Sequence, residues 1–447
     1  MTMRQSEKSR ISRRNFMACS LSAAAGIGFA GKEKLFARDG QDTTGELKIK
    51  EYRTLGRTGF KASDIGLGAG PTNNADVLEA VLDSGINYLD TAEHYVQGNS
   101  ERTIGQVMAK RDRKKVFVTT KLNLAMGGSS YKTLKQRALK CLERLQMDYV
   151  DCLMIHMTPN ADQLKKESYH QVIQELKAEG KVRFTGLSNH GIEHSMAGPT
   201  KESMEKVVLA AAEDGRFDVV LFVYNFLQKE QGEKILKACK EKNMGTTLMK
   251  TNPVKFYSDM ESAFKEAEEK GRKIPDVYRK MLDDYKLRAD EAETFKKKYN
   301  VTSPAQISDA AIKFCLNNPD VHSVCPSINS FEELQSFVAL SGQRLEQTDK
   351  ALLAGYESSF GKFYCRHACG QCESQCPSAV PVNTVMRYHH YFAAQGREKY
   401  AMTKYHNLAG NSAALCSSCS GHCESACPYN VPIQGLLVLA HQTLSLA

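Results

Sequence analysis

The middle of the chain alternates short apolar runs with amphipathic segments. The segments at 74–85, 130–146 and 168–180 place apolar residues every three or four positions, as one face of a helix does. The last of them ends on a glycine suited to a helix C-terminus. Eight apolar runs of four to eight residues are predicted strands: 64–68, 86–91, 116–121, 149–156, 182–188, 219–224, 245–249 and 323–326.

Eight strands alternating with helices predict an α/β protein with a parallel sheet, and their number favours a closed (β/α)8 barrel, the TIM barrel. A doubly wound sheet would place a glycine-rich fingerprint after its first strand. The sequence has no such fingerprint there. We therefore expect one barrel over residues 50–345.

Polar residues stand where several predicted strands end. Asp90 closes the second strand, Tyr95 follows in the same loop, Lys121 closes the third strand and His156 closes the fourth. Singly, each has an ordinary structural explanation, such as a helix N-cap, a surface lysine or a core histidine. Because active sites of such barrels lie at the carboxyl ends of the strands, the four residues together predict a catalytic site at one mouth.

The stretches INYLDTAEHYVQGNSERTIG, VFVTTK, DYVDCLMIH and GKVRFTGLSNH resemble the motifs of the aldo/keto reductases. The resemblance implies that Asp90, Tyr95, Lys121 and His156 are that family's catalytic tetrad. Tyr95 would give its proton to a carbonyl oxygen as a hydride arrives from nicotinamide, while His156 hydrogen-bonds that oxygen and orients the substrate. A free phenol titrates near pH 10, so we expect Lys121, oriented by Asp90, to lower the pKa of Tyr95.

The same resemblance predicts NAD(P)H as a cofactor. It implies that Ser188 and Asn189 hold the carboxamide of the nicotinamide ring. Two residues depart from the family pattern: Leu221 stands where a carboxamide-binding glutamine is common, and Glu333 stands near the place of a basic residue that meets the 2′-phosphate of NADP. These departures predict that NADPH binding is weak, altered or lost.

Eight of the 14 cysteines lie in the last 83 residues, in two blocks that each end in Cys-Pro. The blocks are copies, because CESQCPSAVPV at 372–382 returns as CESACPYNVPI at 423–433, an offset of 51. Four thiolates closed by Cys-Pro are typical of a [4Fe-4S] site, although one gap in each block is a residue longer than usual. Structural zinc and disulfides are the alternatives.

The two blocks resemble a two-cluster ferredoxin, in which the cysteine before proline ligates the other cluster. By that resemblance, one cluster is held by Cys365, Cys369, Cys372 and Cys427, and the other by Cys416, Cys419, Cys423 and Cys376. The 39 residues between the blocks are rich in helix-forming residues, as in the α-helical ferredoxins. We expect residues 365–447 to form a small, mainly helical iron-sulfur domain, joined to the barrel by a helical linker at 346–364.

The first 37 residues resemble a twin-arginine signal peptide. Arg13 and Arg14 precede a short, weakly apolar run that cannot span a bilayer, and cleavage is expected after Ala30 or Ala37. The alternative is a chance Arg-Arg pair in a cytoplasmic protein. Twin-arginine export carries folded proteins, so clusters assembled in the cytoplasm would cross with the chain to the periplasm or cell exterior. We expect no integral membrane span in the mature chain.

The remaining features narrow the classes of partner. The net charge of +9 is spread over mixed-charge segments, which argues against nucleic acid as a partner.

The charged segment 250–300 is a candidate cover for the pocket, a docking surface for the cysteine module, or a solvated insertion. Six other cysteines lack ligand spacing and are predicted packing residues: Cys19, Cys141, Cys152, Cys239, Cys315 and Cys325.

The sequence thus predicts an oxidoreductase that interconverts a small carbonyl compound and an alcohol, with two [4Fe-4S] clusters, NAD(P)H and a one-electron partner protein. A hydride carries two electrons whereas a cluster passes one, so exchange between them usually needs a flavin, and no flavin motif is evident. One alternative is an electron-transfer protein whose barrel is a docking scaffold. Another is a barrel enzyme reduced by an external one-electron donor.

Overall fold

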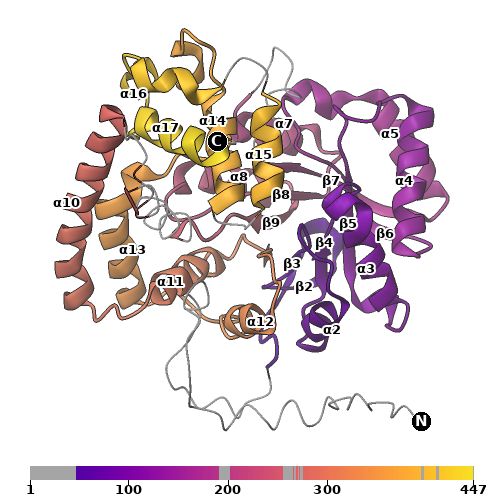
Figure 1. Cartoon of the computed structure of the whole chain (residues 1–447). Helices are drawn as coiled ribbons and strands as arrows, with labels where there is room; N and C mark the ends of the chain where they lie inside the picture. Colours follow the sequence, from indigo (N-terminus) through magenta and orange to yellow (C-terminus); the bar gives the residue numbers. More distant parts are fainter. Residues whose placement is uncertain are drawn as a thin grey trace, which may run out of the picture. The chain divides into compact units, whose positions relative to one another are not determined.

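The eight predicted strands form one parallel sheet. The computed structural model describes residues 47–190, 202–254, 265, 268–269, 271, 275–393, 397–408 and 412–445. The proposed signal peptide, Cys19 and most of 255–274 lie outside these residues. In chain order the sheet contains β3 (Leu67–Gly68), β4 (Tyr88–Asp90), β5 (Phe117–Leu122), β6 (Val150–Ile155), β7 (Val182–Asn189), β8 (Val219–Val223), β9 (Gly245–Met249) and β10 (Ser323–Val324). Strands β3 to β9 are labelled in Figure 1.

The last strand returns to the first, so the sheet closes. Ile65, just before β3, forms a parallel bridge with Val324. The backbone N–H of Gly66 donates to the Val324 carbonyl and that of Gly68 donates to the Pro326 carbonyl, both at 2.8 Å. The expected (β/α)8 barrel is confirmed, and a short antiparallel hairpin of β1 (Tyr52–Thr54) and β2 (Lys61–Ser63) precedes it.

The helices between the strands follow the amphipathic pattern of the sequence. In α4 (Tyr131–Leu145) the N-cap Ser130 side chain accepts the N–H of Thr133, and the apolar residues spaced three or four apart are buried. The other helices around the barrel are α2 (Ala75–Asp83), α3 (Asn99–Met108), α5 (Glu167–Ala178), α7 (Met204–Asp214), α8 (Lys229–Glu241), α11 (Pro304–Asn317) and α12 (Phe331–Val338). None of the described helices is long and apolar enough to cross a lipid bilayer.

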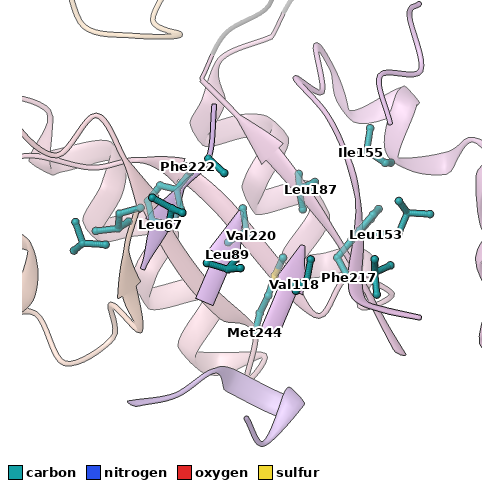
Figure 2. Packing of buried hydrophobic residues seen from close by; sticks show 14 of the residues in the cluster. Leu67, Leu89, Val118, Leu153, Ile155, Leu187, Phe217, Val220, Phe222 and Met244 are labelled. Carbon is teal, nitrogen blue, oxygen red and sulfur yellow. The ribbon is translucent and has the colours of Figure 1, made fainter. Parts of the chain in front are cut away.

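The barrel is filled on both faces of its strands. Leu89, Val118 and Leu153, from three consecutive strands, belong to a continuous cluster that also takes in residues of the surrounding helices (Figure 2). A smaller cluster contains Tyr88 and Phe117, whose rings stack 5.5 Å apart. All five described cysteines outside the two blocks are buried in these clusters, which confirms their predicted packing role.

The C-terminal region is helical, as expected, and packs on the charged insertion. It contains α13 (Gln347–Phe360), α14 (Val382–Ala393), α15 (Glu398–His406), α16 (His422–Ser425) and α17 (Ile433–Leu444). The insertion contributes α10 (Asp276–Lys298), and α10, α11 and α13 share one hydrophobic cluster with the cysteine-rich module. A Cβ on Gly435 would lie 2.8 Å from Met281, so α17 and α10 touch closely there. Of the three roles proposed for the insertion, this packing favours docking, while the boundaries at 346 and 365 remain a prediction.

We expect one histidine to make the barrel sensitive to acid. The backbone N–H of Thr246 donates to Nδ1 of His322 at 3.0 Å, so this nitrogen must keep its lone pair. Burial, and secondly Arg53, lower the pKa of His322 to about 4. Unfolded histidine titrates near 6.5, so the stabilisation is complete above pH 6.5 and is lost as the pH falls towards 4, by up to about 3 kcal/mol.

Denaturant unfolding at pH 7 and pH 4.5 measures this effect. His322→Gln is expected to flatten the dependence on pH, while the exposed histidine variant His422→Gln leaves it unchanged. Parallel pH curves for the parent protein and His322→Gln would contradict the assignment.

Candidate functional site

Asp90 and Lys121 meet inside the carboxyl end of the barrel. Asp90 ends β4 and Lys121 lies in the neighbouring strand β5; their side chains are 2% and 0% exposed as residues, and they form an ion pair. Lys121 Nζ also donates to the carbonyl of Thr91 at 2.7 Å. A buried ammonium needs such partners, so Lys121 is held by two acceptors and Asp90 orients it as expected.

Tyr95 stands over this pair. It begins a 3-10 turn at Tyr95–Gly98, in which Val96 and Gln97 have positive φ angles of 48° and 56°. Lys121 Nζ lies 5.1 Å from the centroid of the Tyr95 ring. Burial first, and then the Asp90 carboxylate, raise the pKa of Tyr95 well above 10. The expected lowering is therefore wrong, because desolvation and Asp90 outweigh the Lys121 charge, which Asp90 largely compensates.

His156 completes the group. It follows β6, is 1% exposed, and its ring lies edge-on to Tyr95 with the centroids 5.5 Å apart. Burial, then the nearby charges of His94 and Lys121, lower the pKa of His156 well below 6.5. The imidazole is therefore neutral at pH 7, and its buried Nδ1 has no hydrogen-bond partner in the part of the chain that the structure describes. All four predicted catalytic residues thus gather at one mouth of the barrel.

Ser188 and Asn189 lie at the end of β7, on the same edge of the sheet. Ser188 Oγ accepts the N–H of Met157 at 3.3 Å, and Asn189 Nδ2 donates to the Thr158 carbonyl at 2.8 Å. Both side chains are buried and hold the loop after β6. The structure therefore gives them a positioning role for the segment next to His156, and their predicted contact with nicotinamide stays a prediction.

The two departures from the family pattern differ in their surroundings. Leu221 is 4% exposed and packs in the apolar interior of the barrel. Glu333 lies in the first turn of α12, where Oε2 accepts the backbone N–H of Asn329 at 2.8 Å. An acid at a helix N-terminus favours the helix but would repel a phosphate placed there.

The cysteine-rich module is bound to the catalytic end of the barrel. Gln228, in the loop after β8, accepts the N–H of His367 at 2.9 Å and donates to the His367 carbonyl at 2.8 Å. In the same loop, Asn225 Nδ2 donates to the Tyr364 hydroxyl at 3.0 Å and to the Lys250 carbonyl at 2.9 Å. The chain entering the first cysteine block is thus fixed to two strand-end loops of the active-site face.

This docking gives residues between the cysteine blocks a place at the barrel that the sequence did not indicate. Tyr391 of α14 is 7% exposed, and the Arg397 guanidinium acts to lower the pKa of Tyr95 against the stronger effect of burial. Arg387, also in α14, is 2% exposed and affects the pKa values of His156 and His190. The mixed helical pattern between the cysteine blocks carries no local signal for this role, because it depends on how α14 meets the barrel.

The internal repeat extends from sequence to backbone. α14 and α17 have the same length and are offset by 51 residues, as the cysteine blocks are. In each copy a glutamate before the helix accepts a backbone N–H from its first turn: Glu373 from Asn383 and Glu424 from Gln434, both at 2.8 Å. One local structure therefore occurs twice.

The thiols gather in crossed sets. Cys365, Cys369, Cys372 and Cys427 line one cavity, which Asn383 and Tyr429 also border. For the other set, burial raises the pKa of Cys416 to about 12 and that of Cys423 to about 11, and Cys376 and Cys419 contribute to both shifts. Cys427 thus lies at the same cavity as three cysteines of the first block, while the two ligand sets stay a prediction.

Among the described residues, all 13 cysteines are free thiols. Within the same residues, no three or more His, Cys, Asp or Glu side chains surround one point as ligands of a metal ion. What these cysteines bind therefore stays a prediction.

Comparison with known proteins adds three findings. The aldo/keto reductase family profile matches residues 64–355. The NADH-specific methylglyoxal reductase of Escherichia coli (strain K12) is 28% identical over 223 residues, which are 42% of this chain and 63% of that protein. A probable voltage-gated potassium channel subunit beta of Oryza sativa subsp. japonica is 28% identical over 308 residues, 61% of this chain and 86% of that protein.

The chain also aligns with solved structures. An aldo-keto reductase from Bacillus halodurans aligns with 68% of this chain and 95% of its own, at 18% identity and a TM-score of 0.49. The chain spans somewhat less than two thirds of the bacterial methylglyoxal reductase.

Proposed function

The chain belongs to the aldo/keto reductase family, and on that basis we propose that its barrel interconverts a small carbonyl compound and the corresponding alcohol, using NAD(P)H. The observation that carries the proposal is the meeting of Asp90, Tyr95, Lys121 and His156 at one mouth. Sequence resemblance alone does not require four side chains from three strand ends to converge.

Each of the four side chains has its own role in the proposed carbonyl reduction. Bound nicotinamide would supply the hydride that adds to the carbonyl carbon. Tyr95 gives its phenolic proton to the carbonyl oxygen, which its raised pKa makes available at neutral pH. The neutral His156 hydrogen-bonds the same oxygen and orients it. Lys121, fixed by Asp90, stabilises the negative charge that develops on Tyr95 as the proton leaves.

We propose that the C-terminal module holds two [4Fe-4S] clusters, each bound by three cysteines of one block and the last cysteine of the other. The cavity shared by Cys365, Cys369, Cys372 and Cys427 supports this ligand set. In a cubane cluster each thiolate binds its own iron, so the sulfur atoms lie further apart than around one ion. The clusters would supply or accept single electrons, which a partner protein would exchange.

The proposed location follows from the sequence of the first 37 residues. We propose export of the folded protein by the twin-arginine route, with cytoplasmic residence as the alternative. Comparing the N-terminal sequence and the location of the chain with those of an Arg13→Lys, Arg14→Lys double variant distinguishes the two.

Anaerobically purified, full-length protein tests the function. We expect NADH or NADPH to be consumed in proportion to the alcohol formed from a panel of neutral aldehydes and ketones. Turnover with reduced viologen but with neither nucleotide would indicate a barrel fed by a one-electron donor. Cluster reduction without any carbonyl turnover would contradict the enzyme proposal and indicate an electron-transfer protein.

Cofactor choice gives a further prediction. Glu333→Arg replaces a negative charge by a positive one near the expected 2′-phosphate, and is expected to raise the preference for NADPH over NADH by about tenfold or more. Glu333→Gln is the control, because its amide oxygen still accepts from Asn329. The ratio of kcat/KM for the two nucleotides is the measurement. An unchanged ratio in Glu333→Arg would remove Glu333 from the cofactor site.

A further inference from the structure

Three cations surround one aromatic ring where the cysteine module meets the barrel. Lys250 Nζ lies 5.3 Å from the centroid of the Tyr391 ring, Arg397 Cζ lies 5.3 Å from it and Arg387 Cζ lies 6.0 Å from it. Lys250 follows β9, whereas the two arginines come from α14 and from the segment after it. The cluster exists only because barrel and module are docked.

These cations are poorly compensated. Arg387 is 2% exposed, and among the described residues its Nε and Nη2 atoms have no hydrogen-bond partner. The buried Nζ of Lys250 has none either. Burial, then Arg387 and Arg397, lower the pKa of Lys250 well below 10.5, which favours the neutral amine unless an anion lies beside it. In the part of the chain that the structure describes, no carboxylate forms a salt bridge with any of the three.

A buried, unpaired charge costs several kcal/mol, and buried groups with strongly shifted pKa values cluster at functional sites. The Tyr391 ring offers only part of this compensation, because a cation-π contact contributes about 0.5–2 kcal/mol. The missing partner is an anion. Planar guanidinium groups are suited to a carboxylate or phosphate, which they bind through paired hydrogen bonds.

The cluster faces the catalytic group. Tyr391 and Arg397 both influence the pKa of Tyr95, and Arg387 influences that of His156. Lys250 influences that of His190, whose ring lies 6.4 Å from the His156 ring. Lys250 itself follows β9 at the strand-end face, where its carbonyl accepts from Asn225 Nδ2 at 2.9 Å, so an anion held by these cations would lie on the same face of the barrel as Tyr95 and His156.

We propose that Lys250, Arg387 and Arg397 form a subsite for an anionic group of the substrate, so that the enzyme acts on small carbonyl compounds bearing a carboxylate or phosphate, such as 2-oxo acids. This inference rests on the proposed function. It assigns substrate selection to the cysteine module as well as to the barrel, because two of the three cations come from the module.

Binding measurements on the full-length, cluster-loaded protein test the subsite. Calorimetric titration compares phenylglyoxylate with its amide, which has the same skeleton without the charge. We expect the parent protein to bind the acid at least tenfold more tightly. Arg387→Gln and Lys250→Gln are each expected to reduce this preference to less than threefold, and Arg387→Lys to retain most of it. Arg279→Gln, an exposed change on α10, is the matched control.

Other outcomes decide against the subsite. Equal affinity of the parent protein for acid and amide would overturn it, as would a preference that survives both glutamine variants. The alternative is that the cations bind the pyrophosphate group of a dinucleotide cofactor, and inorganic pyrophosphate is titrated in parallel to test it. If Arg387→Gln weakens the binding of pyrophosphate but not that of phenylglyoxylate, the cations serve a dinucleotide and the proposal fails.

Two features keep the test decisive. If Arg387→Gln does not fold, Arg397→Gln replaces it, since the side chain of Arg397 is only partly buried. The binding measurement does not depend on turnover. If the subsite proposal fails, the reductase proposal is still tested by Tyr95→Phe. If the barrel shows no turnover, the preference for the charged ligand can still be measured.

Discussion

Tyr95→Phe is expected to lower kcat for carbonyl reduction by about 10²–10⁴-fold, because the side chain that donates a proton in the transition state is lost. The phenyl ring still fills the place beside His156, where the two ring centroids are 5.5 Å apart. Substrate KM and the melting temperature are therefore expected to change little. Steady-state kinetics with a neutral aldehyde, followed as nucleotide oxidation, is the measurement.

The matched control is Tyr131→Phe. Tyr131 is an exposed tyrosine at the start of α4, and its hydroxyl donates to Glu175. Loss of the Tyr131 hydroxyl is expected to leave kcat within twofold of the parent value.

Because the pKa of Tyr95 lies well above 10, Tyr95 keeps its proton in the free enzyme up to pH 9. The rate of carbonyl reduction should therefore not fall up to pH 9 through deprotonation of Tyr95. A loss of less than threefold in Tyr95→Phe would exclude this residue as the proton donor.

Pairs of cysteine replacements are expected to separate crossed from simple ligation of the clusters. With crossed ligation, Cys365→Ser with Cys427→Ser damages one cluster and leaves about four of eight iron atoms, whereas Cys416→Ser with Cys427→Ser damages both. If each block holds its own cluster, Cys365→Ser with Cys427→Ser damages both clusters, whereas Cys416→Ser with Cys427→Ser damages only one. Iron and sulfide assays, with EPR of the dithionite-reduced protein, report the number of clusters.

Cys239→Ser is the control for this series, because Cys239 is a buried packing thiol of the barrel. Its iron content is expected to equal that of the parent protein. Zinc in place of iron, in protein purified anaerobically, would contradict the cluster proposal. Metal binding and folding of such modules are coupled. The iron content of both double variants must therefore be corrected for the fraction of unfolded protein.

Much of this protein could be predicted because the signals are local. The strand at 245–249 is found at the predicted residues, and α4 fills the predicted segment 130–146 up to Gln146. Asp90, Lys121 and His156 were predictable as neighbours, since parallel strands in a barrel bring their carboxyl ends to one mouth. The repeat at an offset of 51 predicted two equal units, and α14 and α17 are its helices.

The sequence by itself determined the order of strands and helices, the catalytic group and the two cysteine blocks, because periodicity and spacing are written along the chain. Only the tertiary structure decided that α10 docks against α17 and that Arg387 and Lys250 meet at Tyr391. It also reversed the expected shift in the pKa of Tyr95. Burial and the distances between charges depend on segments far apart in the sequence, and no local pattern encodes them.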